Sequence, residues 1–266
     1  MRPLATMPAD ARRAVRGVLA DIDDTITTHG ELTAPAYAAL ARLRAAGLLV
    51  VPITGRPAGW CDHIARMWPV DAVVGENGAF WMRYDRAARR LVRRFVADDA
   101  ARAANRARLA AIGERILRAV PSAALASDQH YREADLAIDF REDVAPLPRA
   151  DVDRIVALME AEGLTAKVSS IHVNGWFGHW DKLGTARLML AERFGIDLEA
   201  EREHIVFAGD SFNDEPMFGY FAHAVGVANV LAFRDRMRAL PAWITPSPAG
   251  AGFVELARHL LVARSV

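Results

Sequence analysis

Three carboxylates lie within the four residues from Asp21 to Asp24, directly after the short apolar run 17–20. A buried strand should not end in clustered negative charge unless something offsets the repulsion. A divalent cation would do so, because hard cations bind oxygen ligands. Asp21 is then a candidate nucleophile, since Asp and Glu can form covalent phosphoryl intermediates. On this segment alone, an Asp-rich turn explains the residues equally well.

Two further apolar runs end in polar residues with related chemistry. These residues are Thr54 and Gly55 after the run 48–53, and Asp210, Asn213 and Asp214 after the run 204–208. Ligands of open α/β sheets bind beyond the carboxyl ends of the strands, so we expect Asp21, Asp23, Asp210 and Asp214 to converge. A lone Asp at such a place is usually a cap or a turn former. Four of them favour a bound Mg²⁺, held by carboxylates, waters and a substrate phosphate.

Thr54, Gly55 and Lys182 are candidate phosphate ligands. Thr54 and Gly55 precede a predicted helix and offer a hydroxyl and backbone N–H groups, although an ordinary N-cap explains Thr54 as well. Of the 33 Lys and Arg residues, only Lys167 and Lys182 are lysines. Lysine is a compact point charge, whereas arginine is a planar fork. Because a cation at a helix N-terminus is unfavourable, we interpret Lys182 as a phosphate and carboxylate contact.

The spacing of apolar residues predicts the elements that position these groups. The first part of the chain has predicted strands at 17–20, 48–53 and 71–74. One predicted helix covers 34–46, and a second follows Pro57 and ends at about Met67. A different pattern follows, with strand 89–96, helix 99–119, strand 134–140, helix 151–162, and strands near 164–168 and 170–174. The first pattern resumes with helix 182–194, strands 204–208 and 222–227, and helix 250–263.

These elements predict an α/β protein with a Rossmann-like, doubly wound parallel-sheet core and an inserted α/β cap domain. We expect the core to comprise residues 17–84 and 178–266, and the cap to comprise residues 85–177 with an open antiparallel sheet. Residues 1–16 are expected to be an N-terminal extension, for which a disordered start or a misplaced start codon are equal explanations.

Composition excludes several classes of partner. The net charge is zero and the pI about 7.1, which argues against binding to nucleic acid or an anionic membrane. No apolar run reaches the roughly 18 to 20 residues of a membrane span. The single cysteine, Cys61, excludes an intramolecular disulfide and favours a cytoplasmic location. We expect a monomer or a homodimer.

Together these residues resemble the haloacid dehalogenase superfamily of phosphohydrolases. The four motifs of that family match in order: Asp-Ile-Asp-Asp-Thr at 21–25, Ile53-Thr54, Lys182, and Gly-Asp-Ser-Phe-Asn-Asp at 209–214. The insert between the second and third motifs resembles subclass IIB, which includes Cof-type, sucrose-phosphate and mannosyl-3-phosphoglycerate phosphatases. The segment Glu-Asn-Gly-Ala at 76–79 resembles the turn before the cap of that subclass. Leu183 departs from the pattern, since many relatives have Gly after the lysine.

The resemblance implies a Mg²⁺-dependent phosphomonoester hydrolase that acts through an aspartyl phosphate on a small organic phosphate, such as a sugar phosphate. Asp21 would attack phosphorus, and Asp23 would protonate the leaving oxygen and then activate water. Mg²⁺ would bind the Asp21 carboxylate, the Asp23 carbonyl and Asp210, with Asp214 in support. Thr54, Gly55 and Lys182 would hold the phosphoryl oxygens, and Asn213 would help to place them.

The predicted cap strands carry a candidate substrate-binding face. Alternation places Ser170, His172 and Asn174 on one side, and Lys167 lies just before them. These polar groups suit sugar hydroxyls or a second anion, and a solvated strand face is an equal alternative. Trp176 and Trp180 fit either hinge packing or a platform on which a sugar stacks.

Two other functions share this set of residues. A phosphomutase uses the same aspartyl phosphate but returns the phosphoryl group to its substrate. A non-catalytic metabolite-binding protein would keep the fold alone, yet a pure binder gains nothing from a costly cluster of charge. Dehalogenation fits less well, because that chemistry needs no metal and leaves Asp23 and Asp210 without a purpose.

Overall fold

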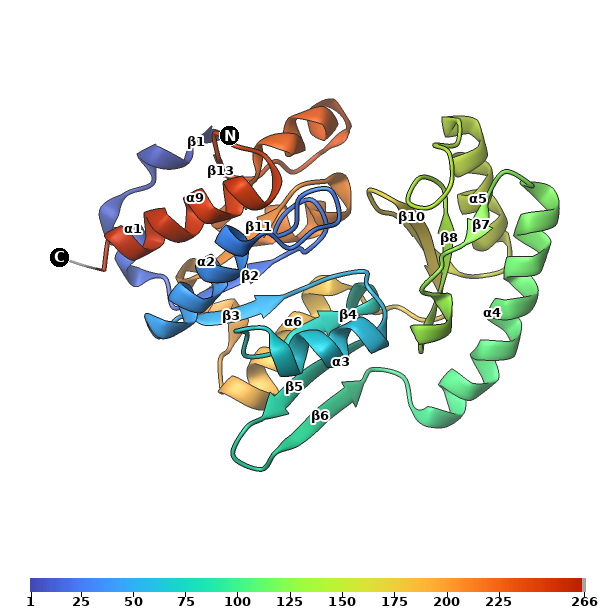
Figure 1. Ribbon diagram of the computed structural model, residues 1–266, viewed down its shortest axis with the longest axis horizontal. Helices are drawn as coiled ribbons and strands as arrows, with labels where there is room; N and C mark the ends of the chain where they lie inside the picture. The colour runs from blue at the N-terminus through green and yellow to red at the C-terminus, as the bar shows by residue number, and fades with distance from the viewer. Residues whose placement is uncertain (265–266) are drawn as a thin grey trace.

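The centre of the molecule is a parallel sheet in which strands from both ends of the chain lie side by side (Figure 1). The computed structural model describes residues 1–264. The sheet order is β1-β13-β12-β11-β2-β3. The strands are β1 (Arg2–Pro3), β13 (Trp243–Ile244), β12 (His223–Gly226), β11 (Ile205–Gly209), β2 (Gly17–Ala20) and β3 (Leu49–Pro52). Because β2 lies between β11 and β3, the motif that follows it opens between two neighbouring strand ends.

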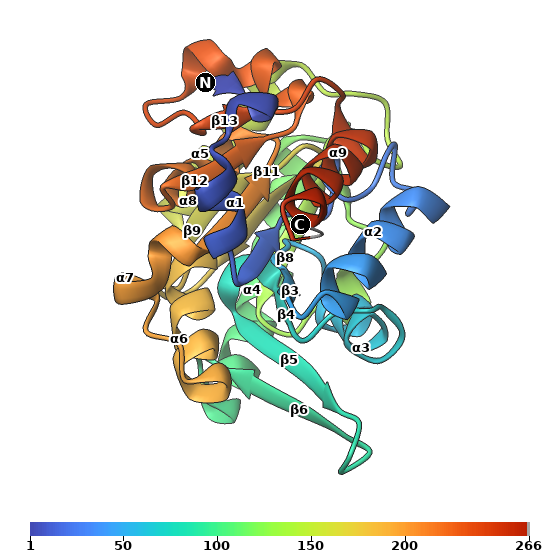
Figure 2. The same ribbon diagram turned by 90° about the vertical axis from the view of Figure 1, so that its left-hand side faces the viewer.

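Helices cover both faces of this sheet, as the doubly wound prediction requires (Figure 2). One face carries α1 (Ala9–Ala14), α2 (Ala34–Ala45), α3 (Ala58–Met67) and α9 (Ala249–Val262). The other face carries α6 (Lys182–Phe194), α7 (Leu198–Glu201) and α8 (Glu215–Tyr220). Alternation within β2 feeds both cores, since Val18 packs in the first and Leu19 in the second. The predicted fold class is therefore confirmed.

A three-stranded antiparallel sheet extends the core beyond β3. It consists of β4 (Val73–Gly75), β5 (Phe80–Asp85) and β6 (Arg90–Phe95), and a parallel bridge between Ile53 and Val74 joins it to the main sheet. We expected the strand at 89–96 within the cap, but β6 pairs with β5 along its whole length. Side-chain packing favours this pairing of β6 with the core, because the ring centroids of Phe80 and Phe95 lie 5.1 Å apart.

The inserted segment forms a second, antiparallel sheet with the order β7-β8-β10-β9. Its strands are β7 (Ala124–Leu125), β8 (Asp135–Asp139), β9 (Thr165–Val168) and β10 (His172–Trp176). Helices α4 (Asp99–Ala119) and α5 (Arg149–Ala161) pack on one face through a separate apolar cluster. Figure 1 shows these helices on the outer side, so the other face of the sheet turns towards the core. We call this unit the cap, and its exact boundaries stay a prediction.

Residues 1–16 are built into the core, which differs from the disordered start that we considered. Arg2 pairs with Trp243 in the register of β1 and β13, and the guanidinium of Arg2 lies 3.7 Å from the centroid of that indole. Leu4 and Met7 are buried in the core. Within residues 1–264, no helix combines the length and apolar character needed to cross a membrane.

Candidate active site

The carboxyl edge of the parallel sheet brings the first and last motifs together. The register pairs Ala20 of β2 with Ala208 of β11, and the Asp21 N–H donates to the Ala208 carbonyl at 2.9 Å. Asp21 and Asp210 therefore follow neighbouring strands at the same height. On the other side of β2, the Ile53 N–H donates to the Ala20 carbonyl at 2.8 Å, which places Thr54 at the same edge.

Lys182 binds two of these aspartates at once. Its Nζ lies 2.7 Å from Asp21 Oδ1 and 2.8 Å from Asp214 Oδ1. The lysine comes from the first turn of α6, which begins after the N-cap residue Asp181. Asp21, Asp210 and Asp214 form one cluster, in which a carboxylate oxygen from each lies within 4.8 Å of the others. All three side chains and Lys182 are buried.

The cluster holds more negative charge than Lys182 balances. Burial raises the pKa of Asp21 to about 8, although Lys182 lowers it and Asp214 raises it further. Burial, followed by the charges of Asp21 and Asp214, raises the pKa of Asp210 well above its ordinary value. The pKa of Lys182 is raised, because the two carboxylates outweigh the cost of its burial. Three buried carboxylates with one lysine are a donor set that fits a hard divalent cation such as Mg²⁺.

Asp210 is held in place by two neutral donors. Asn229 Nδ2 lies 3.2 Å from Asp210 Oδ2, and Thr25 Oγ1 lies 3.4 Å from Asp210 Oδ1. Asn229 also donates to the Asp24 carbonyl at 3.0 Å, at a residue whose φ of 57° is left-handed. Asp24 thus shapes the loop, while its side chain stays outside the cluster. Sequence reasoning missed Asn229, which no motif distinguished.

Thr54 and Gly55 lie in a buried turn beside the cluster. The Thr54 hydroxyl accepts the Arg56 N–H at 3.0 Å, which leaves its own proton for a ligand. The Thr54 carbonyl accepts the Asn77 N–H at 3.0 Å. A Cβ at Gly55 would lie 3.2 Å from the Asn77 side chain, so glycine permits this close approach. The segment 76–79 is therefore in contact with the second motif.

Asp23 does not join the carboxylate cluster. Its carboxylate faces Arg56, with Nε and Nη2 of the guanidinium at 2.9 and 2.8 Å from Asp23 Oδ1. Arg56 Nη2 also donates to Glu142 of the cap at 2.8 Å, and His172 Nε2 lies 2.9 Å from that carboxylate. The cap residue Asp128 lies 3.6 Å from Arg56 Nη1. Sequence reasoning missed Arg56, because one arginine among 31 carries no compositional signal.

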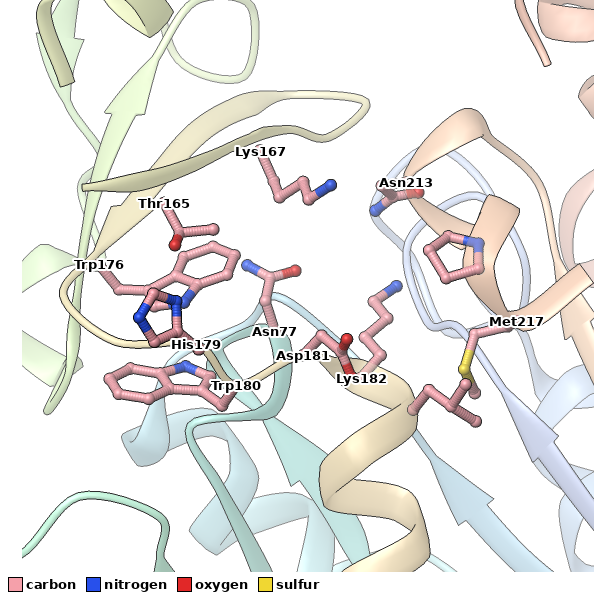
Figure 3. A pocket seen from close by; sticks show the side chains of 12 residues that line it. Asn77, Thr165, Lys167, Trp176, His179, Trp180, Asp181, Lys182, Asn213 and Met217 are labelled. Carbon is pink, nitrogen blue, oxygen red and sulfur yellow. The ribbon is translucent and has the colours of Figure 1, made fainter. Parts of the chain in front are cut away.

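A pocket of about 270 Å³ opens beside the carboxylate cluster, between core and cap (Figure 3). Lys182 and Asn213 form its end nearest the cluster, and Asn77 lies in the middle of the view. Lys167 points into the pocket from the cap strand β9. Trp176 and Trp180 border it on the other side, with ring centroids 6.3 Å apart and planes 17° from parallel.

The predicted cap residues separate in the structure. Lys167 lines the pocket, whereas Asn174 is buried and donates to Asp135 Oδ2 at 2.9 Å. His172 is buried against Glu142, and Ser170 lies in the turn between β9 and β10. A contact of these last three residues with substrate stays a prediction.

Comparison with known proteins agrees with this architecture. No family model and no curated protein matches the sequence. A Thermoplasma acidophilum protein, 0175, superposes with a TM-score of 0.70 at 19% identity, covering 93% of this chain and 99% of its own. The sucrose-phosphatase of Synechocystis, solved with sucrose and phosphate, has a TM-score of 0.61 at 15% identity and covers 93% and 98%. A subclass IIB sugar phosphatase, BT4131, has a TM-score of 0.61 at 12% identity and covers 93% and 100%.

These likenesses define the class of fold. The chain has the haloacid dehalogenase-like fold, with a parallel core sheet and an inserted cap. The arrangement of core and cap is similar to that of the subclass IIB sugar phosphatase BT4131, along nearly the full length of both chains. The resemblance inferred from the motifs is therefore confirmed at the level of the fold.

Proposed function

We propose that this chain is a subclass IIB member of the haloacid dehalogenase superfamily that hydrolyses phosphomonoesters of small organic molecules, sugar-like ones among them. One observation carries the proposal. Asp21, Asp210 and Asp214 lie together at the edge of the sheet, and Lys182 bridges two of them. A purely structural role does not explain three buried carboxylates with a single compensating cation.

Asp21 is the nucleophile in this proposal. Its carboxylate oxygen forms a bond to phosphorus while the bond from phosphorus to the leaving oxygen breaks, which yields an aspartyl phosphate. Lys182, 2.7 Å from Asp21, holds the carboxylate and meets the phosphoryl oxygens. The Thr54 hydroxyl, the backbone N–H groups near Gly55 and the Asn213 amide bind the other oxygens.

Asp23 moves the protons. It gives its proton to the leaving oxygen, and then accepts a proton from the water that attacks the aspartyl phosphate. That attack breaks the bond between phosphorus and Asp21, so inorganic phosphate leaves and both carboxylates return to their starting states. Arg56, which contacts the Asp23 carboxylate, is the positioning residue for this step.

Asp21, Asp210 and Asp214 would hold Mg²⁺, together with the Asp23 carbonyl that the family resemblance suggests. When bound, the cation supplies charge neutralisation between nucleophile and phosphate and stabilises the developing negative charge. The raised pKa values of Asp21 and Asp210 support a cation here, because it would remove the repulsion that burial makes costly.

The first test is phosphate release from p-nitrophenyl phosphate, with Mg²⁺ and with EDTA. We expect turnover only with Mg²⁺, and we expect Asp21→Asn to lower kcat by at least about 1,000-fold with an unchanged circular dichroism spectrum. Asp153→Asn, at an exposed carboxylate of α5, is the matched control and should keep wild-type activity. Normal turnover by Asp21→Asn would refute the nucleophile, and full activity in EDTA would refute the metal. Quantitative phosphate release also separates a hydrolase from a phosphomutase, which returns the phosphoryl group.

A further inference from the structure

Both lysines of this chain line the same pocket. Lys182 lies at the end of the pocket nearest the carboxylate cluster, where its ammonium group donates to Asp21 and Asp214. Lys167 extends into the pocket from the cap (Figure 3). Within residues 1–264, the Lys167 ammonium has no ion pair or hydrogen bond. The other 31 basic residues of the Lys and Arg set are arginines. The two lysines, which carry compact point charges, therefore both face one cavity.

Three polar atoms around the same pocket are buried donors without acceptors. They are Asn77 Nδ2, Trp176 Nε1 and Trp180 Nε1. Buried donors are normally hydrogen-bonded, so such atoms beside a cavity indicate oxygen atoms of a ligand. The indole N–H groups of Trp81 and Trp243 are also unpaired in the described part of the chain, but these rings lie within the apolar cores rather than at the pocket.

Among the described residues that line the pocket, Asp181 is the only carboxylate that could compete for Lys167. One of its oxygens accepts the Gly184 N–H at 2.7 Å as the N-cap of α6. The volume of about 270 Å³ is below that of typical pockets for drug-sized ligands, roughly 300–1,000 Å³. It therefore suits a short chain or one small ring.

We propose that the pocket binds the leaving-group part of a small phosphomonoester that carries a second oxyanion, a carboxylate or a second phosphate, paired with Lys167. Acceptor oxygens of the same group meet Asn77 Nδ2 and the Trp180 indole N–H. This inference rests on the proposed phosphatase function and adds the chemical class of the substrate. It also assigns separate tasks to the two lysines: Lys182 serves the reacting phosphate, and Lys167 serves the distant anion.

The test compares esters that differ in the second anion. The carboxylate pair is 3-phosphoglycerate against glycerol 3-phosphate, and the phosphate pair is fructose 1,6-bisphosphate against fructose 6-phosphate. We expect kcat/KM to favour the anionic member of at least one pair by about 10-fold or more, which also identifies the anion. Lys167→Met should reduce this ratio by about 10-fold or more, towards equal kcat/KM values for the two esters, because a charge-assisted hydrogen bond is lost. Lys167→Arg should retain part of the preference.

Arg154→Met is the matched control, because Arg154 is an exposed cation of the cap on α5. It should leave the ratio of kcat/KM values at the wild-type level. Equal ratios in wild type and Lys167→Met, or a wild-type preference for the ester without a second anion in both pairs, would overturn the proposal.

Binding separates failure of this inference from failure of the proposed function. Calorimetric titration of the wild-type protein and of Lys167→Met in EDTA with 3-phosphoglycerate, glycerol 3-phosphate and both fructose phosphates requires no turnover. Anion-selective binding that Lys167→Met abolishes, together with no hydrolysis of any ester, would support the pocket and overturn the phosphatase. Hydrolysis of p-nitrophenyl phosphate without anion selectivity in either assay would overturn the pocket and support the phosphatase.

Discussion

Lys182 forms ion pairs with Asp21 and Asp214, which leaves Asp210 as the member of the cluster without a cationic partner among the described residues. Asp210 receives donors only from neutral groups, Asn229 and Thr25, at 3.2 and 3.4 Å within the described residues. Its raised pKa follows from burial and from the neighbouring charges of Asp21 and Asp214. Neutralising Asp210 should therefore have opposite effects on two properties: it should stabilise the metal-free fold and weaken Mg²⁺ binding.

We expect Asp210→Asn to stabilise the metal-free protein against thermal unfolding and to reduce the further stabilisation that Mg²⁺ provides. The amide keeps the shape of the side chain but relieves repulsion in the cluster, so the Tm in EDTA should rise above that of wild type. Mg²⁺ should raise the Tm of wild type, because it binds the folded state, and should raise that of the variant less. At saturating Mg²⁺, kcat should fall on the order of 100-fold.

Thermal melts with and without Mg²⁺ and initial rates across a Mg²⁺ titration measure these effects. Asp153→Asn serves as the surface control and should respond to Mg²⁺ as wild type does. An equal Mg²⁺-induced shift in Tm for wild type and Asp210→Asn would show that Asp210 does not bind the ion.

At the scale of elements, the turn 76–78 fixes the start of α6. Gly78 has a φ of 107°, and a Cβ there would lie 2.1 Å from the Asp181 carbonyl oxygen and 3.0 Å from the Lys182 nitrogen. The Gly78 carbonyl accepts the Thr185 hydroxyl at 2.5 Å. The turn therefore packs directly on the residues that carry the Lys182 ammonium into the site.

Gly78→Ala should displace Lys182 as well as strain the backbone. We expect a loss of about 2–4 kcal/mol in the free energy of unfolding, which combines left-handed strain with the clash. We expect kcat to fall by 10-fold or more in the folded fraction, since the Lys182 ammonium moves from its place beside Asp21. Urea unfolding and single-turnover rates measure the two effects.

Gly47→Ala is the matched control for this prediction. Gly47 also has a positive φ, 79°, but open space surrounds its would-be Cβ. This control should lose only about 1 kcal/mol, the cost of a Cβ in the left-handed region, and should keep wild-type kcat. Equal kinetic behaviour of the two variants would contradict a role of the turn in placing Lys182.

At the scale of the whole molecule, a group of buried polar contacts joins cap and core. Glu76 accepts the backbone N–H groups of Glu133 and Ala134 at 2.9 and 2.7 Å. Arg132 donates to the Gly55 carbonyl at 3.0 Å. Together with the Arg56–Glu142 ion pair at 2.8 Å, these contacts hold the cap over the sheet edge. The same ion pair connects the cap to Asp23.

Glu142 should make this link sensitive to pH. Burial favours the neutral acid, but the contacts with His172 and Arg56 outweigh it and lower the pKa of Glu142 from 4.5 to about 2. A carboxyl whose pKa is depressed in the folded state adds stability above its unfolded pKa. That stability is lost as the pH falls from about 5 towards 2.

We expect Glu142→Gln to cost about 1–3 kcal/mol at pH 7, after allowance for the partial exposure of this side chain, and only about a quarter of that near pH 2.5, because this pH approaches the folded-state pKa of about 2. Urea unfolding of wild type and variant at both pH values gives the difference. The variant should also lower kcat, because Arg56 loses the nearer of its two carboxylate partners in the cap and Asp23 depends on Arg56. A cost that is the same at both pH values would rule out the ionised Glu142 link.

The sequence alone determined the core of the site, because its main information is local. Apolar runs define strands, and in a parallel sheet their carboxyl ends meet at one edge. This rule predicts that Asp21, Asp23, Asp210 and Asp214 converge, and the structure brings together Asp21, Asp210 and Asp214 but not Asp23. The rarity of lysine likewise singled out Lys167 and Lys182, both of which line one pocket.

Only the tertiary structure decided the contacts between segments that are far apart in the chain. Arg56 and Glu142 are separated by 86 positions, and their pairing depends on how the cap docks, which no local pattern encodes. For the same reason Asp23 faces Arg56 rather than the carboxylate cluster, and β6 packs beside β5 rather than in the cap. Local periodicity specifies elements, whereas burial and charge pairing across the assembled fold choose which side chains meet.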